Sequence, residues 1–478
     1  MDRFTILPME KLNGMSPREQ KIKYAWDAYE GNLTPPLRQR RGQPDDNVMV
    51  NTSRVIVDKG VSFLFGKGVT WNLDADETRS ADEKYLDDTW IFNNKEQILH
   101  QLAINGGITG HAFLKMRIDQ PYVKLSVLDS SKVDVQSADN DYSDILAYVI
   151  RWEGRINPVN GKQRHYRQII QKMRAFTEVL DDDSIVENPQ TWMIIDQETD
   201  SNLFGTKDDV WHTIMTETWP FPFAPIIDCQ NMPMPNQFWG TSDLEKDIIG
   251  LNEDINRALS NINRIIRLHA HPKTWSRGLT EQQIHQLVID PDGVIHLPGE
   301  MGSLQNLEMN SDLSSSLNYY KELKSALYEI SRVPKIAFGN EENVNYLAAV
   351  AMQVLYGPLI EKTEVKHKTY GHLIREANRR ILAVSGRGDD QMVDLVWPNM
   401  LPRDILLEAQ VAIMKQQAGV SKDTTIEELG HNPAYERTRR QADLAETVTE
   451  TGLIAKASAA GQPPRPPQDP QENTNGNV

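Results

Sequence analysis

The chain has 478 residues, enough for two or three domains with cores of their own, and its 39% hydrophobic and 25% charged residues are typical of a globular protein. Proteins that hold DNA tightly usually have a basic face, because neutralising the phosphates dominates such binding. The net charge of this chain, −16, has the opposite sign. No apolar run approaches the ~18 residues of a membrane span. The segment 1–20 has no apolar signal core, so we expect a cytosolic chain.

The single cysteine, Cys229, excludes an intrachain disulfide and a cysteine-based metal site. It lies in an apolar stretch between two prolines, and free cysteines are usually buried. We therefore predict that it is a buried small side chain.

Hydrophobic periodicity predicts a largely helical beginning. The expected elements are helices at 17–29, 51–64 (ended by Gly66) and 95–108 (ended by Gly106 and Gly107), with a strand at 68–73. The acidic stretch 74–88 is interpreted as a solvated face or loop.

From 111 to 219 the pattern changes to short alternating runs separated by turn residues. The expected strands are 113–118, 123–127, 145–152, 165–170 and 191–195. This predicts a mostly antiparallel β region packed on the preceding helices, and hence an α+β fold. The proline-rich stretch 219–235 is expected to be an extended connector.

Three long helices follow. Residues 241–269 predict a continuous helix with Thr241, Ser242 and Asp243 as N-cap and first-turn residues, roughly 43 Å long at ~1.5 Å per residue. A small module punctuated by Pro and Gly is expected at 272–310, a returning helix at 312–332, a break at 334–339 and a third helix at 343–384. The C-terminal part predicts a strand at 394–397, helices at 403–419, 421–429 and 433–455, and a disordered tail at 461–478.

No catalytic, cofactor or metal residue is predicted. The segment 60–67 has the glycines and lysine of a phosphate loop, but the spacing is wrong and a helix precedes it, so a helix C-cap is the better interpretation. The run 181–183 of three aspartates is typical of a solvated loop. No histidine pair has the helical spacing of a zinc hydrolase. A Ser/His/Asp triad stays open, because its members need not be close in sequence.

Several strings, taken in order, resemble a known family. They are 51–58, 63–69, 106–114, 220–225, 239–244, 396–404 and 419–436. The chain is similar to the portal proteins of tailed double-stranded DNA bacteriophages, in particular the group found in phages of Gram-positive hosts. The similarity spans about residues 20–455.

The resemblance implies a multi-domain fold with an α/β wing, a long-helix stem, a small α/β clip and an α-helical crown. Its parts would be an N-terminal arm (1–19), wing (20–239), descending stem helix (240–270), clip (271–311), returning stem helix (312–333), tunnel loop (334–345), long wing and tunnel helix with connector (346–400), crown (401–455) and disordered tail (456–478).

The resemblance also implies a ring of about twelve copies at one capsid vertex, through which double-stranded DNA is packaged and ejected. The clip would dock the large terminase and later the head-completion adaptor, and the major capsid and scaffolding proteins are further expected partners. The ring would be assembled in the host cytoplasm and carried in the virion, without cofactor, enzymatic activity or membrane contact.

The residues expected to act in such a ring form three groups. The tunnel-loop residues facing DNA would be Pro334, Lys335, Ile336, Phe338, Gly339, Asn340, Glu341, Glu342 and Asn343. The channel lysines would be Lys321, Lys324 and Lys335, which would touch phosphate weakly while an otherwise acidic wall keeps the duplex mobile. The docking residues of the clip would be Trp275, Arg277, His285, Asp292, His296 and Glu300.

Two alternatives stay open. A DNA-packaging ATPase or nuclease would need a phosphate loop or clustered carboxylates, and neither occurs in the sequence. A head–tail adaptor that does not form the translocation channel would normally be shorter and would lack so large a β region.

Overall fold

The computed structural model describes residues 16–39, 45–72, 81–158, 161–173, 176–179, 185–188, 190–201, 210–270, 274–277, 303–306, 313–339, 349–388, 393–401, 405–428, 436–437 and 439–441. The chain divides into a large unit, 1–71 with 84–402, and a small unit, 72–83 with 403–478. Helices and sheets both contribute, which confirms the predicted α+β class.

Helices α1, α2, α3 and α4 come first in the described chain. They are followed by two long helices, α5 and α7, and by the 36-residue helix α8. The helical bounds are α1 Pro17–Glu30, α2 Thr52–Phe65, α3 Ala81–Phe92, α4 Lys95–Thr109, η1 Ser130–Lys132, α5 Lys246–Ala270, α7 Leu313–Ser331, η2 Lys335–Phe338, α8 Ala349–Val384, α9 Ile405–Gln417 and α10 Lys422–Glu428.

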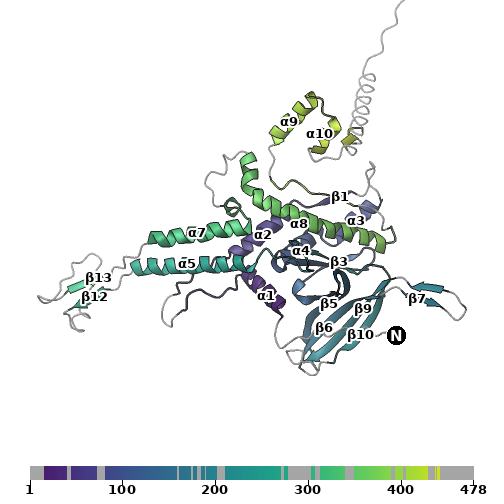
Figure 1. Ribbon diagram of the computed structural model, residues 1–478, viewed down its shortest axis with the longest axis horizontal. Helices are drawn as coiled ribbons and strands as arrows, with labels where there is room; N and C mark the ends of the chain where they lie inside the picture. Colours follow the sequence, from purple (N-terminus) through teal and green to yellow (C-terminus); the bar gives the residue numbers. More distant parts are fainter. Residues whose placement is uncertain are drawn as a thin grey trace, which may run out of the picture. The chain divides into compact units, whose positions relative to one another are not determined.

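Two antiparallel sheets form the β region of the large unit (Figure 1). One has the strand order β11-β2-β3 and the other β10-β9-β6-β5-β4, while β1-β14, β12-β13 and β7-β8 are two-stranded. The strand bounds are β1 Thr70–Asn72, β2 His111–Arg117, β3 Lys124–Leu128, β4 Val133–Ala138, β5 Asp141–Ile156, β6 Gln163–Met173, β7 Phe176–Val179, β8 Ile185–Asn188, β9 Thr191–Ser201, β10 His212–Trp219, β11 Ile226–Gln230, β12 Thr274–Arg277, β13 Ser303–Asn306 and β14 Asp394–Val396.

The two larger sheets share one hydrophobic core. Side chains of both sheets and of the segments beside them meet there, and the buried members include Phe113, Val133, Tyr148, Ile170, Trp192, Trp219 and Ile226. Helix α4 contacts β2 and β3, and α8 contacts β11. The predicted packing of an antiparallel β region on the preceding helices is therefore confirmed.

Local chemistry explains the helix ends that the sequence predicted. Helix α1 begins with a capping box, in which Ser16 and Glu19 satisfy each other's backbone N–H groups, and it ends at Gly31 in the left-handed conformation. Helix α2 ends before Gly66, whose N–H donates to the Ser62 carbonyl. The segment 60–67 is thus a helix end, as predicted, and Cys229 is buried in β11 as expected.

The structure corrects four of the expectations. Residues 81–88 of the acidic stretch are helical in α3, where Leu86 is fully buried. The expected connector 219–235 contains a strand, β11, that pairs with β2. Helix α4 runs through its two glycines to Thr109, and helix α5 begins at Lys246, five residues later than expected.

The small unit is described through α9 and α10. Ser421 begins α10 as predicted, since its side-chain oxygen accepts from the Asp423 N–H and its carbonyl from the Thr425 N–H. Thr425 and Ile426 are its buried side chains. Most of the expected helix 433–455 lies outside the described residues, as does the 461–478 tail.

Gly106 of α4 lies against the side chain of Tyr370 of α8. A Cβ atom there would stand 1.9 Å from the hydroxyl oxygen of Tyr370, which is buried and donates a hydrogen bond to Asn231 at 3.1 Å. The absence of a side chain at this position is therefore a packing requirement.

We predict that Gly106→Ala destabilises the protein by about 1–3 kcal/mol, the usual cost of overpacking a core. Gly250→Ala is the matched control, because α5 has nothing within 4 Å of a Cβ at that position and loses only a helix-breaking glycine. Thermal melting compares the two variants. A Gly106→Ala melting temperature equal to or above that of the parent would contradict the prediction.

His367 on α8 stacks on Trp397, with ring centroids 4.0 Å apart. Burial lowers the pKa of His367 to about 4, and a hydrogen bond with the Leu64 backbone only partly opposes it. The unfolded chain binds a proton at this histidine first, near its ordinary pKa of 6.5. The contribution of His367 to stability is therefore complete above pH 6.5 and is lost as pH falls toward 4.

We expect His367→Phe, which keeps the aromatic contact, to flatten the fall in melting temperature between pH 6.5 and 4. His372→Phe is the control, since His372 is exposed on the same helix. Equal pH slopes for the parent and His367→Phe would contradict the assignment.

Candidate functional site: the α5–α7 pair and the junction behind it

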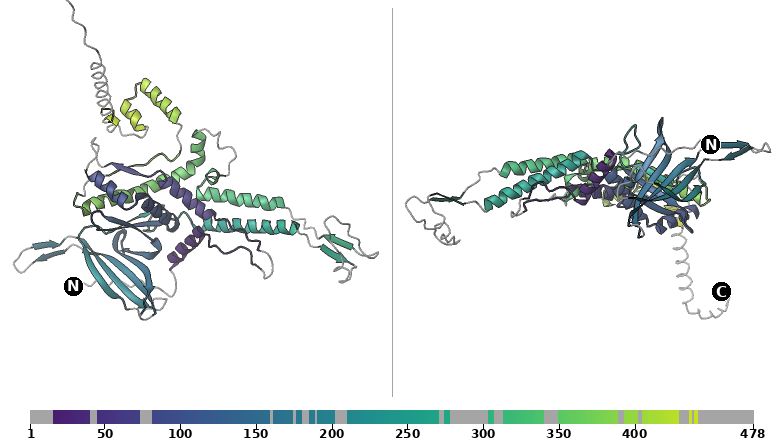
Figure 2. Two further views of the ribbon diagram at one scale, coloured as in Figure 1. Left: turned by 180° about the vertical axis from the view of Figure 1, so that it is seen from behind. Right: turned by 90° about the horizontal axis from the view of Figure 1, so that it is seen from below.

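Helices α5 and α7 lie side by side and project from the body of the large unit, as the views in Figures 1 and 2 agree. The strands β12 and β13 follow α5 and precede α7, so this small sheet stands at the far end of the pair. The two helices run antiparallel, because the chain leaves along one and returns along the other.

The apolar residues of α5 explain why it pairs with α7. Ile255, Ala258 and Ile262 recur at helical spacing and are buried. Tyr319 and Ser316 of α7 lie opposite Ala258. The apolar stripe of α5 is therefore buried, while Leu317 and Tyr319 of α7 are exposed.

A polar stripe on α5 holds an extended segment, 45–51. The N–H groups of Val48 and Val50 donate to Ser260 and Asn256 at 2.9 Å each. Further along, Arg264 and Arg267 bind the carboxylate of Asp46 at 3.1 and 2.6 Å. Hydrogen bonds from Arg267, helped by Arg264, lower the pKa of Asp46 to about 2. The segment 45–51 is thus fixed by side chains whose spacing repeats every three or four residues.

A buried charge cluster lies where α5 begins and α7 ends, and we did not predict it from the sequence. It consists of Asp243, Lys362 and Lys366 and is here called the junction. Lys362 approaches the Asp243 carboxylate to 3.1 Å, and Lys366 donates to its other oxygen. The side chains of Asp243 and Lys366 are 2% and 4% exposed. Asp243 thus lies in a non-helical segment before α5 and binds α8, which is why it does not cap α5.

Several backbone groups complete the junction. The Asp243 N–H donates to the Gly107 carbonyl at 2.7 Å, and Lys362 donates to the carbonyl of Ser331, the last residue of α7. Asn231 contributes a hydrogen bond to Asp243 at 3.3 Å. The junction therefore joins α4, α7, α8 and the segment that enters α5.

The two lysines of the junction hold Asp243 in its charged form. Burial alone would raise the pKa of Asp243, but the charges and hydrogen bonds of Lys362 and Lys366 outweigh it and hold that pKa well below its usual range. Burial lowers the pKa of Lys366, against the attraction of Asp243. One carboxylate thus faces two ammonium groups in a water-poor interior.

The residues expected to face a channel lie in α7 and η2 where the structure describes them. Lys321 is exposed on α7, and Lys324 is half-buried with its Nζ 5.6 and 5.8 Å from the ring centroids of Tyr320 and Tyr328. Lys335 is the exposed first residue of η2.

Buried and packed side chains hold the segment 334–339 in place. Pro334 precedes η2, Ile336 is buried, Phe338 packs on Tyr328 at a centroid distance of 5.0 Å, and Gly339 adopts a positive φ of 79°. The remaining expected loop residues, Asn340, Glu341, Glu342 and Asn343, lie outside the described residues.

Of the expected docking residues, Trp275 and Arg277 lie on β12, where Arg277 is exposed and pairs in register with Ser303. Four others lie outside the described residues: His285, Asp292, His296 and Glu300. The structure therefore places two of these six residues on one strand and does not test the group as a whole.

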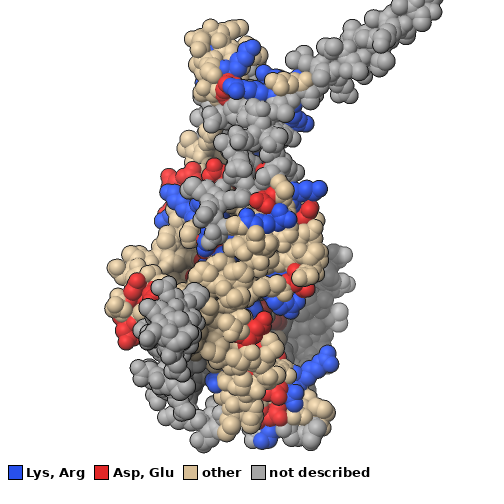
Figure 3. All heavy atoms as spheres, turned by 90° about the vertical axis from the view of Figure 1, so that its right-hand side faces the viewer, with Lys and Arg blue, Asp and Glu red and all other residues tan. Residues whose placement is uncertain are grey.

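Charges on the surface are mixed. On the face that Figure 3 presents, Lys and Arg are interspersed with Asp and Glu, and the described residues of that face form no basic patch. In the same residues, no group of three or more His, Cys, Asp or Glu side chains could hold a metal ion. None of the described helices is long and apolar enough to cross a membrane.

A model of the family of phage portal proteins, SPP1 Gp6-like, matches residues 11–449. The chain belongs to this family. No curated protein sequence matches it.

Portal proteins connect the head of a tailed phage to its tail, and this chain has that function. The family is structural, forms oligomeric rings, interacts with capsid and terminase, and is located in the virion capsid. Nothing in the fold or the match favours an ATPase, a nuclease or an adaptor.

We predict that Asp243→Asn destabilises this portal protein by about 3–5 kcal/mol, because it leaves two buried lysines without a carboxylate. Asp119→Asn removes an ion pair whose two side chains are exposed, so it should change stability by less than about 1 kcal/mol. Urea unfolding of the two variants measures the difference. Equal midpoints would mean that the junction does not hold the large unit together.

Proposed function

We propose that about twelve copies of this chain form a ring around double-stranded DNA at one capsid vertex, with α5 and α7 running along the ring axis. The observation that carries the proposal is the projecting α5–α7 pair, with a two-stranded sheet beyond its far end and η2 and the 36-residue α8 following its return. A long, narrow, antiparallel pair suits a wall segment repeated around an axis.

Each part of the chain has a proposed role in this ring. We assign the wing to 20–239, the stem to 240–270 and 312–333, the clip to 271–311, the tunnel loop to 334–345, the long helix and connector to 346–400 and the crown to 401–455. The flanking segments, 1–19 and 456–478, are assigned as arm and tail.

The tunnel loop would meet the DNA. The anchored residues Pro334, Ile336 and Phe338 hold its beginning, and Lys335 is exposed there. The exposure of Lys321 supports it as a second channel lysine, whereas the packing of Lys324 on two tyrosines supports it less. Such lysines would touch phosphates briefly without stopping a duplex, since the chain as a whole is acidic.

The clip would dock other proteins at the far end of the pair. Its proposed contact residues are those predicted from the sequence, of which Arg277 is exposed on β12. The partners would be the large terminase during packaging and a head-completion adaptor afterwards, with the major capsid and scaffolding proteins around the ring. Assembly would take place in the host cytoplasm, and ATP hydrolysis would belong to the terminase.

We predict that Lys335→Ala lowers the amount of nuclease-protected DNA packaged into heads several-fold while leaving ring assembly unchanged, because a phosphate contact repeated in every copy is lost. Lys132→Ala is the control, since Lys132 is an exposed lysine that pairs with Asp129 on the β region. If the Lys335→Ala ring packages and retains DNA like the parent, Lys335 has no role in the channel.

A further inference from the structure

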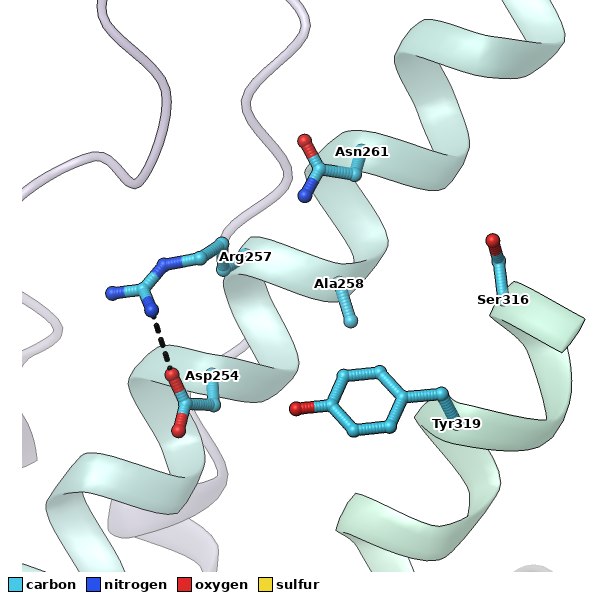
Figure 4. Close-up of a pocket in the computed structure, with 6 residues that line it drawn as sticks. All are labelled: Asp254, Arg257, Ala258, Asn261, Ser316 and Tyr319. Carbon is cyan, nitrogen blue, oxygen red and sulfur yellow. Dashed lines mark hydrogen bonds and ion pairs between the residues drawn. The ribbon is translucent and has the colours of Figure 1, made fainter. Parts of the chain in front are cut away.

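A hollow of about 150 Å³ opens on one side of the α5–α7 pair (Figure 4). Ala258 and Ser316, which have small side chains, line it together with Asn261, and Tyr319 points across it from α7 toward α5. Asp254 and Arg257 form an ion pair of 3.0 Å at its edge. Small residues thus leave a space on this side that is large enough to admit one aliphatic side chain.

The opposite side of the pair carries an uncovered aliphatic side chain. Successive helical residues are ~100° apart, so Leu317 points to the side opposite Tyr319, two residues away. Leu317 is 40% exposed, and Ile266 of α5 is 50% exposed. The pair therefore has a hollow on one side and a projecting leucine on the other.

Leu317 and the hollow lie at the same height along the pair. At ~1.5 Å per residue, Leu317 is displaced along α7 by only about 1.5 Å from Ser316 and 3 Å from Tyr319. Copies in a closed ring are related by rotation about one axis, without translation along it. A residue that enters a neighbour's hollow must therefore come from the same height, on the other side of the molecule.

We propose that Leu317 of one copy fills the hollow between Ala258, Ser316 and Tyr319 of the next copy in the ring. This rests on the proposed ring with α5 and α7 along its axis. The contact is heterologous, because a different surface is used on each side, and it repeats until the ring closes. The exposed Asp254–Arg257 pair forms the polar rim that surrounds apolar contacts at protein interfaces.

Cysteine crosslinking tests the contact directly in the full-length protein. The native Cys229 is first replaced by serine, and Ala258→Cys and Leu317→Cys are then introduced together. A disulfide needs Cα atoms within about 7 Å, so oxidation should link neighbouring copies into a ladder that ends at the ring size. Each single-cysteine variant should give no such ladder, and pairing Ala258→Cys with Ser325→Cys, about two turns further along α7, is the position control.

A second variant measures the energy of the contact. Leu317→Asp should raise about tenfold the protein concentration below which rings dissociate, because a charge replaces a leucine that the proposed contact buries. Asn318→Asp adds the same charge at the adjacent exposed position and should leave that concentration unchanged.

The outcomes separate this inference from the ring itself. Rings that form without a ladder, with Leu317→Asp equal to Asn318→Asp, would overturn the contact and leave the ring intact. A parent that forms no ring would overturn both. A ladder confined to the Ala258 and Leu317 pair, together with weakened Leu317→Asp rings, is the result we expect.

Discussion

Two lysines and one aspartate, buried together where several segments meet, are the interaction on which the arrangement of the large unit depends. A buried charge without a partner is costly, so Asp243 must stay within reach of Lys362 and Lys366. That requirement fixes α8 against the entry to α5, and the bond from Lys362 to Ser331 brings the end of α7 to the same place. The direction of the α5–α7 pair is therefore set by the junction.

Close packing around the charges is part of the same constraint. A Cβ at Gly107 would lie 3.2 Å from an oxygen of Asp243, and one at Gly60 would lie 3.5 Å from it. Glycine at 107 lets α4 reach the junction without crowding the carboxylate, whereas a Cβ at 60 would make only an ordinary van der Waals contact with it. The polar stripe on α5 also fixes a neighbouring segment, since its side chains bind 45–51 through specific hydrogen bonds and ion pairs. Apolar side chains elsewhere on the pair, such as Ile266 and Leu317, stay exposed.

Periodicity and capping predicted the elements whose cause is local. Helices α1, α2, α7 and most of α8 follow from apolar spacing and from caps such as Ser16. The strand β11 was missed because its pairing with β2, more than 100 residues earlier, overrides a proline-rich composition. Asp243 was misread as a helix cap for the same reason, because its partners lie more than 100 residues away on α8.

For the candidate site, the sequence predicted where the break between the helices lies but not how its side chains are packed. The break after α7 was read correctly from Pro334 and Gly339, since both act on their own backbone. The burial of Ile336 depends on tertiary contacts that spacing does not encode. The packing of Lys324 is local, since Tyr320 and Tyr328 lie four residues before and after it on α7. A local sign of the junction was available, however: two lysines four residues apart on a helix face that otherwise continues with Tyr370 and Leu373.

The central claim is that this chain is one wall segment of a closed ring, and the mass of the native particle tests it most directly. Native mass spectrometry, with electron-microscope class averages of the same sample, measures the copy number and the central opening together. The account predicts one species of about twelve copies with a hole that admits a DNA duplex. A uniform monomer or dimer that persists at high concentration and across salt conditions would contradict it.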